Sequence, residues 1–578
     1  MIARVLPDVT GLDKQFDYLV PGELHDRVRV GSIVRVELHG RRVGGWVTAL
    51  LDHSDVASDD LKPIAKITGH GPGADIQELA AWAAVRWAAR RIRPFLIAGA
   101  PKRAIVSLPA AQQTANSPQP ASPATTELLT SGGGVLRLPP RSDVMPSILS
   151  AVAIGPTLVV TPLQAEVLRL ATRLRRAGCT VAVVPDDWAA AAAGVDVVIG
   201  TRRAAWMPCA DLAAAIVIDE HDDALQDERT PTWHARDVVV ERCRRAGVPY
   251  ALISPAPTLV AVEEYAGPDG VVHPPAERER RGWPSVEVID RNGDEPWRRS
   301  LVTSRLIEVL RSDQRVICVS NTTGRARVLA CRSCLALTRC ETCDAAVGLD
   351  DDGRLGCRRC GTERPPVCQS CGSGSFANLR PGVTRLREEL EAAAARPVVA
   401  VTGGDDDPVP TDAGIYVGTE AVLHRVGSVD VVVFLEFDSE MLAPRFRASE
   451  QALGLLVHAA RLAPHVAIQT FEPDHDVVRA AVEADPDIVV ETERARRQML
   501  GLPPFAALAQ VSGSDLDEFT KAARAAASAT GVALQIGRVD ETRALFRAGS
   551  WPTLGQLLNS VERPAGSRLR VEVDPARV

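Results

Sequence analysis

The chain has 578 residues, of which 46% are hydrophobic and 24% are charged, and its formal net charge is −7. This length allows three or four hydrophobic cores and so predicts several domains, while the mild acidity excludes a basic field over the whole surface. A local basic groove remains compatible with DNA binding. The chain has neither an apolar signal segment after Met1 nor a run of 18 apolar residues, so we expect a soluble cytoplasmic protein with reduced thiols and no membrane partner.

Residues 1–105 are expected to form a small β-rich domain with one helix. Alternating apolar and polar residues between Gly and Pro turns predict strands, and an apolar face predicts a helix that Pro94 stops. The strands are expected over 2–6, 15–20, 32–38 and 43–50, and the helix over 76–93. The arginines Arg90, Arg91 and Arg93 allow two interpretations: contacts to phosphate, or a solvated helix end favoured by the helix dipole.

Residues 106–139 are expected to be a flexible linker. The segment is rich in Ala, Gln, Ser, Pro, Thr and Gly from about residue 107 to residue 134. Such a composition buries too little apolar surface to fold.

Two lobes with parallel sheets are expected after the linker. Short apolar strands alternate with amphipathic helices, which is typical of a parallel sheet covered on both faces. The first lobe is assigned to 140–295 and the second to 296–330 and 373–500, with a cysteine-rich segment inserted directly after the second lobe's first strand. A last domain over 501–578 alternates strand, helix and strand. The predicted fold class is therefore multidomain α/β, with a small α+β C-terminal domain.

Eight of the twelve cysteines fall in four C-x2-C pairs. The pairs are Cys331 and Cys334, Cys340 and Cys343, Cys357 and Cys360, and Cys368 and Cys371. A pair on a tight turn directs two thiolates at one ion, at a Zn–S distance of about 2.3 Å, so four pairs supply two closed four-cysteine sites. Gly361 and Gly372 follow two of the pairs and permit the positive φ that turns backbone N–H groups toward the sulfurs.

We interpret this segment, 331–372, as a module with two Zn²⁺ ions. Closed sites leave no position for water, so the ions are structural. An iron–sulfur cluster is one alternative, but the spacing does not match ferredoxin runs. Disulfides are another, and the expected reducing compartment argues against them. The spacing alone leaves open which pairs share an ion.

The predicted strand before Asp219 ends in an acidic motif. Asp219 and Glu220 follow the apolar run Ile216–Ile218. This arrangement resembles a Walker B strand end, where the first carboxylate holds Mg²⁺ and the second polarises the attacking water. Many α/β strands end in acidic residues, so the motif is weak when taken alone.

Over almost its full length the chain resembles the PriA family of replication restart proteins. The cysteine spacing inside a split second lobe carries most of the specificity. The resemblance also rests on Phe16–Leu19, Gly200–Arg202, Asp219–Glu220, His234–Asp237, Phe446–Arg447 with Glu450, Gly501–Phe505 and Val573–Pro575.

The resemblance implies two RecA-like lobes and a nested set of zinc ligands. The sets are Cys331, Cys334, Cys368 and Cys371 around one ion, and Cys340, Cys343, Cys357 and Cys360 around the other. The family's winged-helix domain has too little room in 106–139 and is expected to be absent or vestigial.

The resemblance also implies that the N-terminal domain captures the 3′ end of a nascent DNA strand. The matching positions are Phe16 and Asp17, with Gly40 and Lys62 as further candidates. An aromatic ring can stack on a terminal base, and a carboxylate can accept a hydrogen bond from the 3′-hydroxyl. The alternative for Phe16 and Asp17 is a core aromatic beside a turn aspartate.

The nucleotide site departs most from the family. A phosphate-binding loop needs the pattern G-x4-G-K-[ST], but 141–155 contains neither the paired glycines nor a lysine, and no lysine occurs between Lys102 and Lys521. The region expected to hold arginine fingers keeps Arg461, which is out of register. These losses argue against ATP and Mg²⁺ as cofactors and leave Asp219 and Glu220 as a degenerate Walker B pair.

We therefore predict a primosome protein that binds stalled or abandoned replication forks and supports helicase reloading, without helicase activity of its own. By resemblance, its partners are branched DNA, primosome proteins, the replicative helicase and its loader, and single-stranded-DNA-binding protein, at the nucleoid. One alternative is an active ATP-dependent 3′-to-5′ DNA helicase with a non-standard nucleotide site. Another is a zinc-ribbon adaptor for transcription or repair, which explains the cysteines but not the two lobes.

Overall fold

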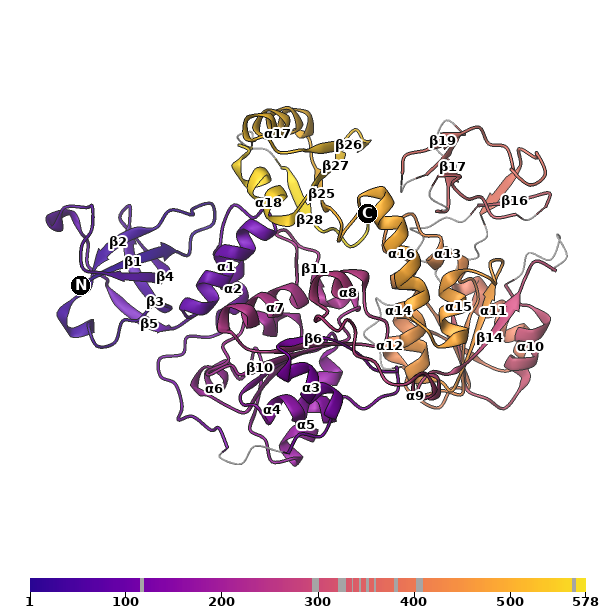
Figure 1. Cartoon of the computed structure of the whole chain (residues 1–578), viewed down its shortest axis with the longest axis horizontal. Coiled ribbons are helices and arrows are strands. Elements are labelled where there is room, and N and C mark those ends of the chain that lie inside the picture. The colour runs from indigo at the N-terminus through magenta and orange to yellow at the C-terminus, as the bar shows by residue number, and fades with distance from the viewer. Residues whose placement is uncertain are drawn as a thin grey trace.

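The computed structural model describes residues 1–114, 119–293, 301–320, 329–334, 336–342, 345–349, 353–357, 360–378, 383–401, 409–563 and 568–578. Figure 1 shows the N-terminal domain at one end, the first lobe in the middle and the second lobe at the other end, with the C-terminal domain above the lobes. The predicted fold class is confirmed: a β-rich N-terminal domain, two parallel-sheet lobes, an inserted cysteine module and a small α+β C-terminal domain.

The N-terminal domain is a five-stranded antiparallel sheet in the order β2-β1-β4-β3-β5, followed by two helices. Its elements are β1 (Ile2–Pro7), β2 (Phe16–Leu19), β3 (Ser32–Leu38), β4 (Arg41–Leu51), β5 (Lys66–His70), α1 (Ala74–Arg86) and α2 (Arg93–Gly99). The helix predicted over 76–93 is wrong in its last part, since α1 ends at Arg86. Pro94 does not stop a helix but lies in the first turn of α2, where its missing N–H costs nothing.

The first lobe has a six-stranded parallel sheet in the order β6-β13-β10-β7-β9-β8. Helices flank the sheet, and β11 and β12 form a separate two-stranded pair. The elements are α3 (Pro123–Thr130), β6 (Gly133–Arg137), α4 (Met145–Val152), β7 (Thr157–Val160), α5 (Gln164–Arg176), β8 (Val181–Val183), α6 (Trp188–Ala193), β9 (Val197–Gly200), β10 (Ala214–Ile218), β11 (Gln226–Asp227), β12 (Trp233–His234), α7 (Ala235–Ala246), β13 (Tyr250–Ser254), α8 (Leu259–Tyr265) and α9 (Ala276–Arg281).

The linker predicted over 106–139 is wrong in its second half, which belongs to the first lobe. Helix α3 buries Leu128 and Leu129, and every residue of β6 is buried beside β13. A Cβ on Gly133 would lie 2.3 Å from the carbonyl oxygen of Tyr250, and Gly133 has a φ of +110°. The glycines that suggested a linker therefore permit a close approach of two strands.

The second lobe has a six-stranded parallel sheet in the order β14-β24-β23-β15-β22-β21. The elements are β14 (Ser285–Asp290), α10 (Ser304–Arg311), β15 (Val316–Val319), α11 (Val383–Ala394), β21 (Val398–Val401), β22 (Ile415–Gly418), α12 (Ala421–Arg425), β23 (Val431–Phe434), α13 (Asp438–Met441), α14 (Ala448–Leu462), β24 (His465–Thr470), α15 (Asp476–Glu483) and α16 (Asp487–Leu500).

The boundary predicted at 295 between the lobes is also wrong, because β14 pairs with β24 of the second lobe. The cysteine module therefore follows the second strand of this sheet, β15, rather than the first. Strand β14 lies at the sheet edge and is partly exposed along its length. An edge strand of this kind lacks the continuous apolar run that marks a central parallel strand.

The cysteine module contains short strands, and the C-terminal domain is a four-stranded antiparallel sheet in the order β26-β27-β25-β28 with two helices. The module's strands are β16 (Leu329–Cys331), β17 (Gly348–Leu349), β18 (Leu355–Gly356), β19 (Glu363–Arg364) and β20 (Phe376–Asn378); the C-terminal domain comprises β25 (Ala507–Ser512), α17 (Leu516–Thr530), β26 (Gln535–Asp540), β27 (Arg543–Ala548), α18 (Trp551–Ser560) and β28 (Arg570–Val573).

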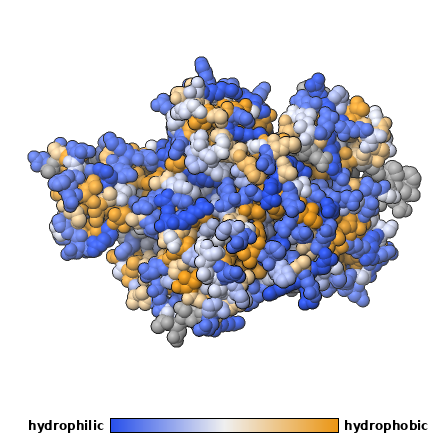
Figure 2. Space-filling model, viewed as in Figure 1, coloured by the Kyte–Doolittle hydropathy of each residue, from blue (hydrophilic) through white to orange (hydrophobic). Residues whose placement is uncertain are grey.

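The C-terminal domain joins both lobes. The side chain of Asp574 accepts a hydrogen bond from Arg447 of the second lobe at 2.5 Å, and its carbonyl oxygen accepts one from Gln226 of the first lobe at 2.7 Å. Figure 2 shows hydrophilic residues spread over the face seen in Figure 1, with smaller apolar areas between them. Among the residues described, none of the helices has the length and apolar character needed to span a bilayer.

Candidate DNA-binding and metal sites

Asp17, the predicted acceptor for a 3′-hydroxyl, lies on the edge strand β2 and is already paired. In the sheet it stands opposite Arg4, whose guanidinium contacts both carboxylate oxygens at 2.8 and 3.1 Å. Ser54 donates a further hydrogen bond at 2.7 Å. The hydrogen bond from Arg4 holds the pKa of Asp17 below its usual range, so the side chain is a carboxylate at neutral pH. A carboxylate has about four acceptor positions, so a hydroxyl can still bind there.

The other three candidate residues surround β2 and the β3–β4 turn. Phe16 is half-buried against the domain core, and Lys14 lies 5.5 Å from its ring centroid. The Lys62 carbonyl accepts from the Leu19 amide of β2 at 2.9 Å, and its ammonium contacts Glu37 at 2.6 Å. Gly40 forms the β3–β4 turn with a φ of +76°. The structure thus places Phe16, Asp17 and Lys62 around one strand edge.

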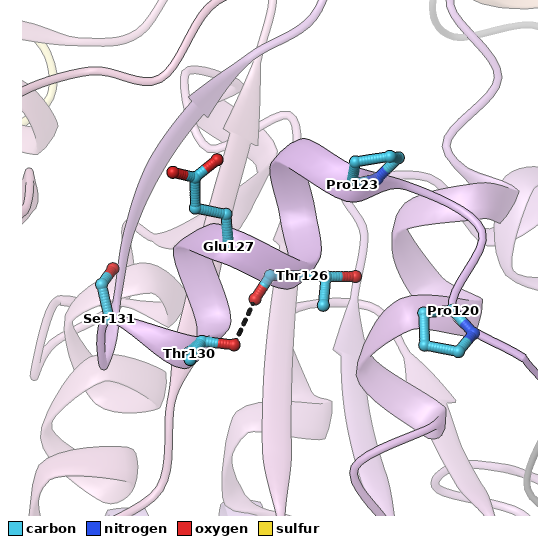
Figure 3. A pocket seen from close by; sticks show the side chains of 6 residues that line it. All are labelled: Pro120, Pro123, Thr126, Glu127, Thr130 and Ser131. Carbon is cyan, nitrogen blue, oxygen red and sulfur yellow. Dashed lines mark hydrogen bonds between the residues drawn. The ribbon is translucent and has the colours of Figure 1, made fainter.

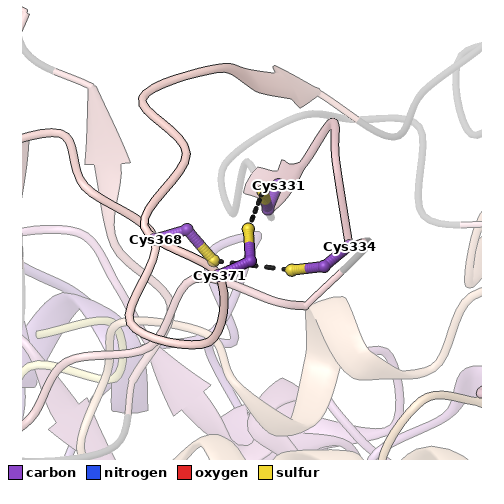
Figure 4. Close-up of side chains that lie close together, drawn as sticks. All are labelled: Cys331, Cys334, Cys368 and Cys371. Carbon is purple, nitrogen blue, oxygen red and sulfur yellow. Dashed lines mark hydrogen bonds between the residues drawn. The ribbon is translucent and has the colours of Figure 1, made fainter.

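The first metal candidate is built from the outer two cysteine pairs. The sulfurs of Cys331, Cys334, Cys368 and Cys371 all lie within 4.8 Å of one another. Figure 4 shows them facing a common point, with Sγ–Sγ distances of 3.5 Å for Cys331 and Cys371 and 3.6 Å for Cys334 and Cys368. Sulfurs around one tetrahedral ion lie about 3.8 Å apart. The four thiols therefore fit a single metal ion.

Local geometry favours the thiolate form at Cys331, whereas the facing thiols raise the pKa of Cys334 and Cys371. Burial alone would raise the pKa of Cys331, but hydrogen bonds from the Cys334 and Ser333 amides and from facing thiols lower it to about 6. The φ values of Gly361 and Gly372 are +75° and +74°, as predicted for these two turns. Thiolate is the form of cysteine that binds metals.

The second candidate contains Cys340, Cys357 and Cys360, whose sulfurs also lie within 4.8 Å of one another. Cys343, the predicted fourth member, lies outside the described residues. The module rests on the second lobe, because the Ala346 amide donates to the Leu442 carbonyl at 2.7 Å and Arg339 forms an ion pair with Glu472. Two cysteine clusters that could hold metal ions are thus fixed beside the second lobe.

The predicted Walker B aspartate faces the second lobe. Arg461 of α14 contacts both oxygens of Asp219 at 2.5 and 2.6 Å, and its Nε donates to the Pro140 carbonyl at 3.2 Å. Burial alone would raise the pKa of Asp219, but the charge and hydrogen bonds of Arg461 outweigh burial and lower it. Arg141, at the start of the segment where a phosphate-binding loop would lie, donates to the Ala460 carbonyl at 2.9 Å. These contacts close the two lobes over Asp219.

Glu220 is fully buried in a chain of ion pairs that leads away from the lobe interface. It contacts Arg236 at 3.1 Å, Arg236 contacts Asp237 at 2.9 Å, and Asp237 contacts Arg86 of α1 at 3.1 Å. Burial raises the pKa of Glu220 despite the opposing charge of Arg236. Both Glu220 oxygens also accept hydrogen bonds from Thr258. The second residue of the predicted Walker B pair thus connects the first lobe to the N-terminal domain.

A pocket of about 620 Å³ opens beside α3. It is lined by Pro120, Pro123, Thr126, Glu127, Thr130 and Ser131. Figure 3 shows these side chains along α3 and its approach, with Thr130 donating to the Thr126 carbonyl. None of them is a predicted site residue, so the pocket adds no member to the sites above.

Sequence reasoning missed the arginine partners of the acidic candidates. The pairing of Arg4 with Asp17 was detectable, because β1 and β2 are short strands near the start of the chain and these two residues stand opposite each other. Arg461 was noted only as an arginine out of register, and Arg236 only as part of a motif. Their pairing with Asp219 and Glu220 carries no local sequence signal.

Comparisons with known proteins agree with the N-terminal assignment. Residues 4–94 match the family model described as the 3′DNA-binding domain of PriA. Two solved structures are similar only weakly: yeast Dbp5 bound to RNA and ADP BeF3, with a TM-score of 0.33, 11% identity and coverage of 66% of this chain and 93% of that chain; and the DUF1998 helicase MrfA bound to DNA, with a TM-score of 0.35, 11% identity and coverage of 81% and 69%.

Curated relatives share sequence along most of the chain. The replication restart protein PriA of Bacillus subtilis is 28% identical over 57% of this chain, and the match spans only 44% of that protein. The probable replication restart protein PriA of Mycobacterium tuberculosis H37Rv is 29% identical over 87% of this chain and 85% of its own. The Mycobacterium leprae protein of the same name is 27% identical over 97% of this chain and 95% of its own length. Over most of its length the chain is therefore similar to proteins named replication restart protein PriA.

Proposed function

We propose that this chain recognises abandoned replication forks, holds the 3′ end of the nascent strand in its N-terminal domain and supports primosome assembly, without ATP-driven strand separation of its own. The replicative helicase, its loader and single-stranded-DNA-binding protein are the proposed partners at the nucleoid. DNA binding by a replication restart protein is supported by the 3′DNA-binding-domain match and by the named relatives.

The observation that carries the loss of motor activity is the Asp219–Arg461 pair. A motor's first Walker B carboxylate must reach Mg²⁺, and its lobes must open and close around nucleotide. Here both oxygens of Asp219 are held by an arginine of the opposite lobe, and Glu220 is held by Arg236 and Thr258. No lysine is present between 103 and 520 to grip a phosphate. The two lobes are thereby suited to act as a rigid scaffold.

We further propose that each cysteine cluster binds one Zn²⁺, in the nested sets, with Cys343 completing the second site. Four thiolates at this spacing suit zinc, and a closed site has a structural role. Cys331 and Cys371 belong to opposite ends of the module, so an ion between them ties its two ends together.

Fork recognition is tested with a fork that carries a leading-strand 3′-hydroxyl at the branch and the same fork with a 3′-phosphate. The full chain is expected to prefer the hydroxyl end. Asp17→Ala should weaken binding to that fork about tenfold, because a hydrogen bond to a charged acceptor contributes about 1.5 kcal/mol or more. Asp26→Ala, an exposed aspartate of the same domain, is the matched control. Equal binding of both forks by the unaltered chain would contradict the proposal.

The helicase alternative is tested in the same preparation by DNA-stimulated ATP hydrolysis and strand separation. Both are expected to stay at background. Hydrolysis that is robust in the unaltered chain and abolished by Glu220→Gln would favour the active helicase instead.

A further inference from the structure

The N-terminal and C-terminal domains meet in a close joint between the end of α1 and α18. Asn559 donates to the Ala84 carbonyl at 2.9 Å, and the guanidinium of Arg86 lies 4.0 Å from the ring centroid of Trp551. A Cβ on Gly555 would lie 1.9 Å from the Val85 carbonyl oxygen, so the helices touch through backbone. The segment that follows α1 is therefore held beside the C-terminal domain, and the segment that follows α18 is held beside the N-terminal domain.

Three arginines lie in the two segments that follow α1 and α18. Arg90 donates from Nη2 to the Val561 carbonyl at 3.0 Å, Arg91 follows it, and Arg563 lies two residues beyond Val561. Arg90 is exposed, while Arg91 and Arg563 are half-buried. Partial burial lowers the pKa of Arg563, and the charges of Arg90 and Arg91 lower it further. The positive charges of Arg90 and Arg91 thus act on the Arg563 guanidinium.

Few negative charges balance this cluster. Burial raises the pKa of Asp13, and the positive charge of Arg91 partly offsets this rise. The exposed Glu562 precedes Arg563 in the sequence. Across the described ranges, none of the three arginines forms an ion pair with a carboxylate. In the same ranges the shielded Nε of Arg563 has no hydrogen-bond partner. Like charges held together with no carboxylate paired to them indicate a site for an anion.

We propose that Arg90, Arg91 and Arg563 bind the phosphate backbone of a DNA strand that passes from the N-terminal domain to the C-terminal domain. The inference rests on the proposed function and extends its DNA path. Asp13, on which the charge of Arg91 acts, lies in the loop that leads into β2, the strand of Phe16 and Asp17. A guanidinium binds phosphate through two parallel hydrogen bonds. Arg90 keeps most of its five donors for this purpose.

The test measures the Kd of the full chain for the 3′-hydroxyl fork at several NaCl concentrations. Arg91→Gln and Arg563→Gln are each expected to weaken binding about threefold to tenfold and to lower the salt slope by about one. The preference for a 3′-hydroxyl over a 3′-phosphate should stay unchanged, because a phosphate contact carries no end specificity. Arg524→Gln, an exposed arginine on α17 of the same C-terminal domain, is the control with the same charge change.

Arg563→Lys keeps the charge and guards against a folding defect, so it should retain the salt slope that Arg563→Gln loses. If Arg91→Gln and Arg563→Gln match Arg524→Gln while the unaltered chain binds forks, this inference is overturned and the proposed function stands. If the unaltered chain binds no DNA, both are overturned.

Discussion

Asp219 shows how an aspartate at a position typical of catalytic residues can instead form a structural contact. It follows β10 with a φ of +54°, and its buried carboxylate receives two hydrogen bonds from Arg461. A buried ion pair is a weak source of net stability, but removing one partner leaves an uncompensated charge. The contact therefore matters more for the alignment of the two lobes than for total stability.

Breaking this pair from either side is expected to destabilise the chain. Asp219→Asn and Arg461→Met should each lower the free energy of the first unfolding transition in urea by about 2–4 kcal/mol, and the double variant should lose less than the sum. Arg494 and Glu263 form a more exposed inter-lobe pair, and its removal should cost about 1 kcal/mol or less. Additive losses at Asp219 and Arg461 would show that the pair does not act as a unit.

The pH dependence of this pair has a definite sign. The pKa of Asp219 is lower in the folded chain than in the unfolded chain. Its contribution to the stability of the fold is therefore fully present above the pH range in which carboxyl groups ordinarily titrate. It is lost only as the pH falls through the lower, folded pKa. The stability difference between the unaltered chain and Asp219→Asn should therefore be constant from pH 8 to about pH 5 and shrink only below about pH 4.

At the scale of elements, the joint between α1 and α18 fixes the DNA-binding domain to the rest of the molecule. Arg86 contributes to it twice, through the cation–π contact with Trp551 and through the ion pair with Asp237 of α7. Asp237 in turn leads through Arg236 to Glu220. A single buried chain thus links the N-terminal domain, the first lobe and the C-terminal domain.

Gly555→Ala is expected to open this joint. The added Cβ would overlap the Val85 carbonyl, and the clash should outweigh the gain of about 1 kcal/mol in helix propensity, for a net loss of about 1–3 kcal/mol. Hydrogen exchange of the α1 amides measures the effect. Gly549→Ala, where an added Cβ would have open space, should leave α1 protected. Unchanged protection of α1 in Gly555→Ala would contradict the close contact.

For the whole molecule, the cysteine module is an insertion that we expect to depend on metal rather than on apolar burial. Its core cluster contains few residues, among them Leu355 and Cys357. A domain this small usually needs metal or disulfides to fold. Loss of the metal should leave the two lobes intact, because each has a hydrophobic core of its own.

Metal analysis of the full chain is expected to give two zinc ions. In the nested arrangement, Cys331→Ser with Cys368→Ser should lose one ion, whereas Cys331→Ser with Cys340→Ser should lose both. Cys179→Ser, a buried cysteine of the first lobe, should keep both. Chelation should abolish hydrogen-exchange protection in 331–372 but not in β7 or β23. Loss of one ion from the Cys331 and Cys340 double variant would contradict the nested pairing.

The sequence alone determined those features that depend on neighbouring residues. Apolar strands, amphipathic helices and C-x2-C turns are local patterns, so the two lobes and the cysteine module were predictable, and the missing lysine of the phosphate-binding loop could be read directly. Glycines were the exception, because the Gly132–Gly134 run has the composition of a linker but permits the close pairing of β6 with β13.

Only the tertiary structure decided what the remaining polar residues do. Asp219 and Arg461 are 242 residues apart in the chain, and Arg90 and Val561 are 471 apart. Such pairs have no spacing rule, because their meeting depends on how separate domains pack. The partner of a buried charge is fixed by that packing, whereas the residue type alone fixes only its chemistry. The same acidic motif can therefore bind Mg²⁺ in a motor, whereas in this chain its aspartate accepts hydrogen bonds from an arginine of the opposite lobe.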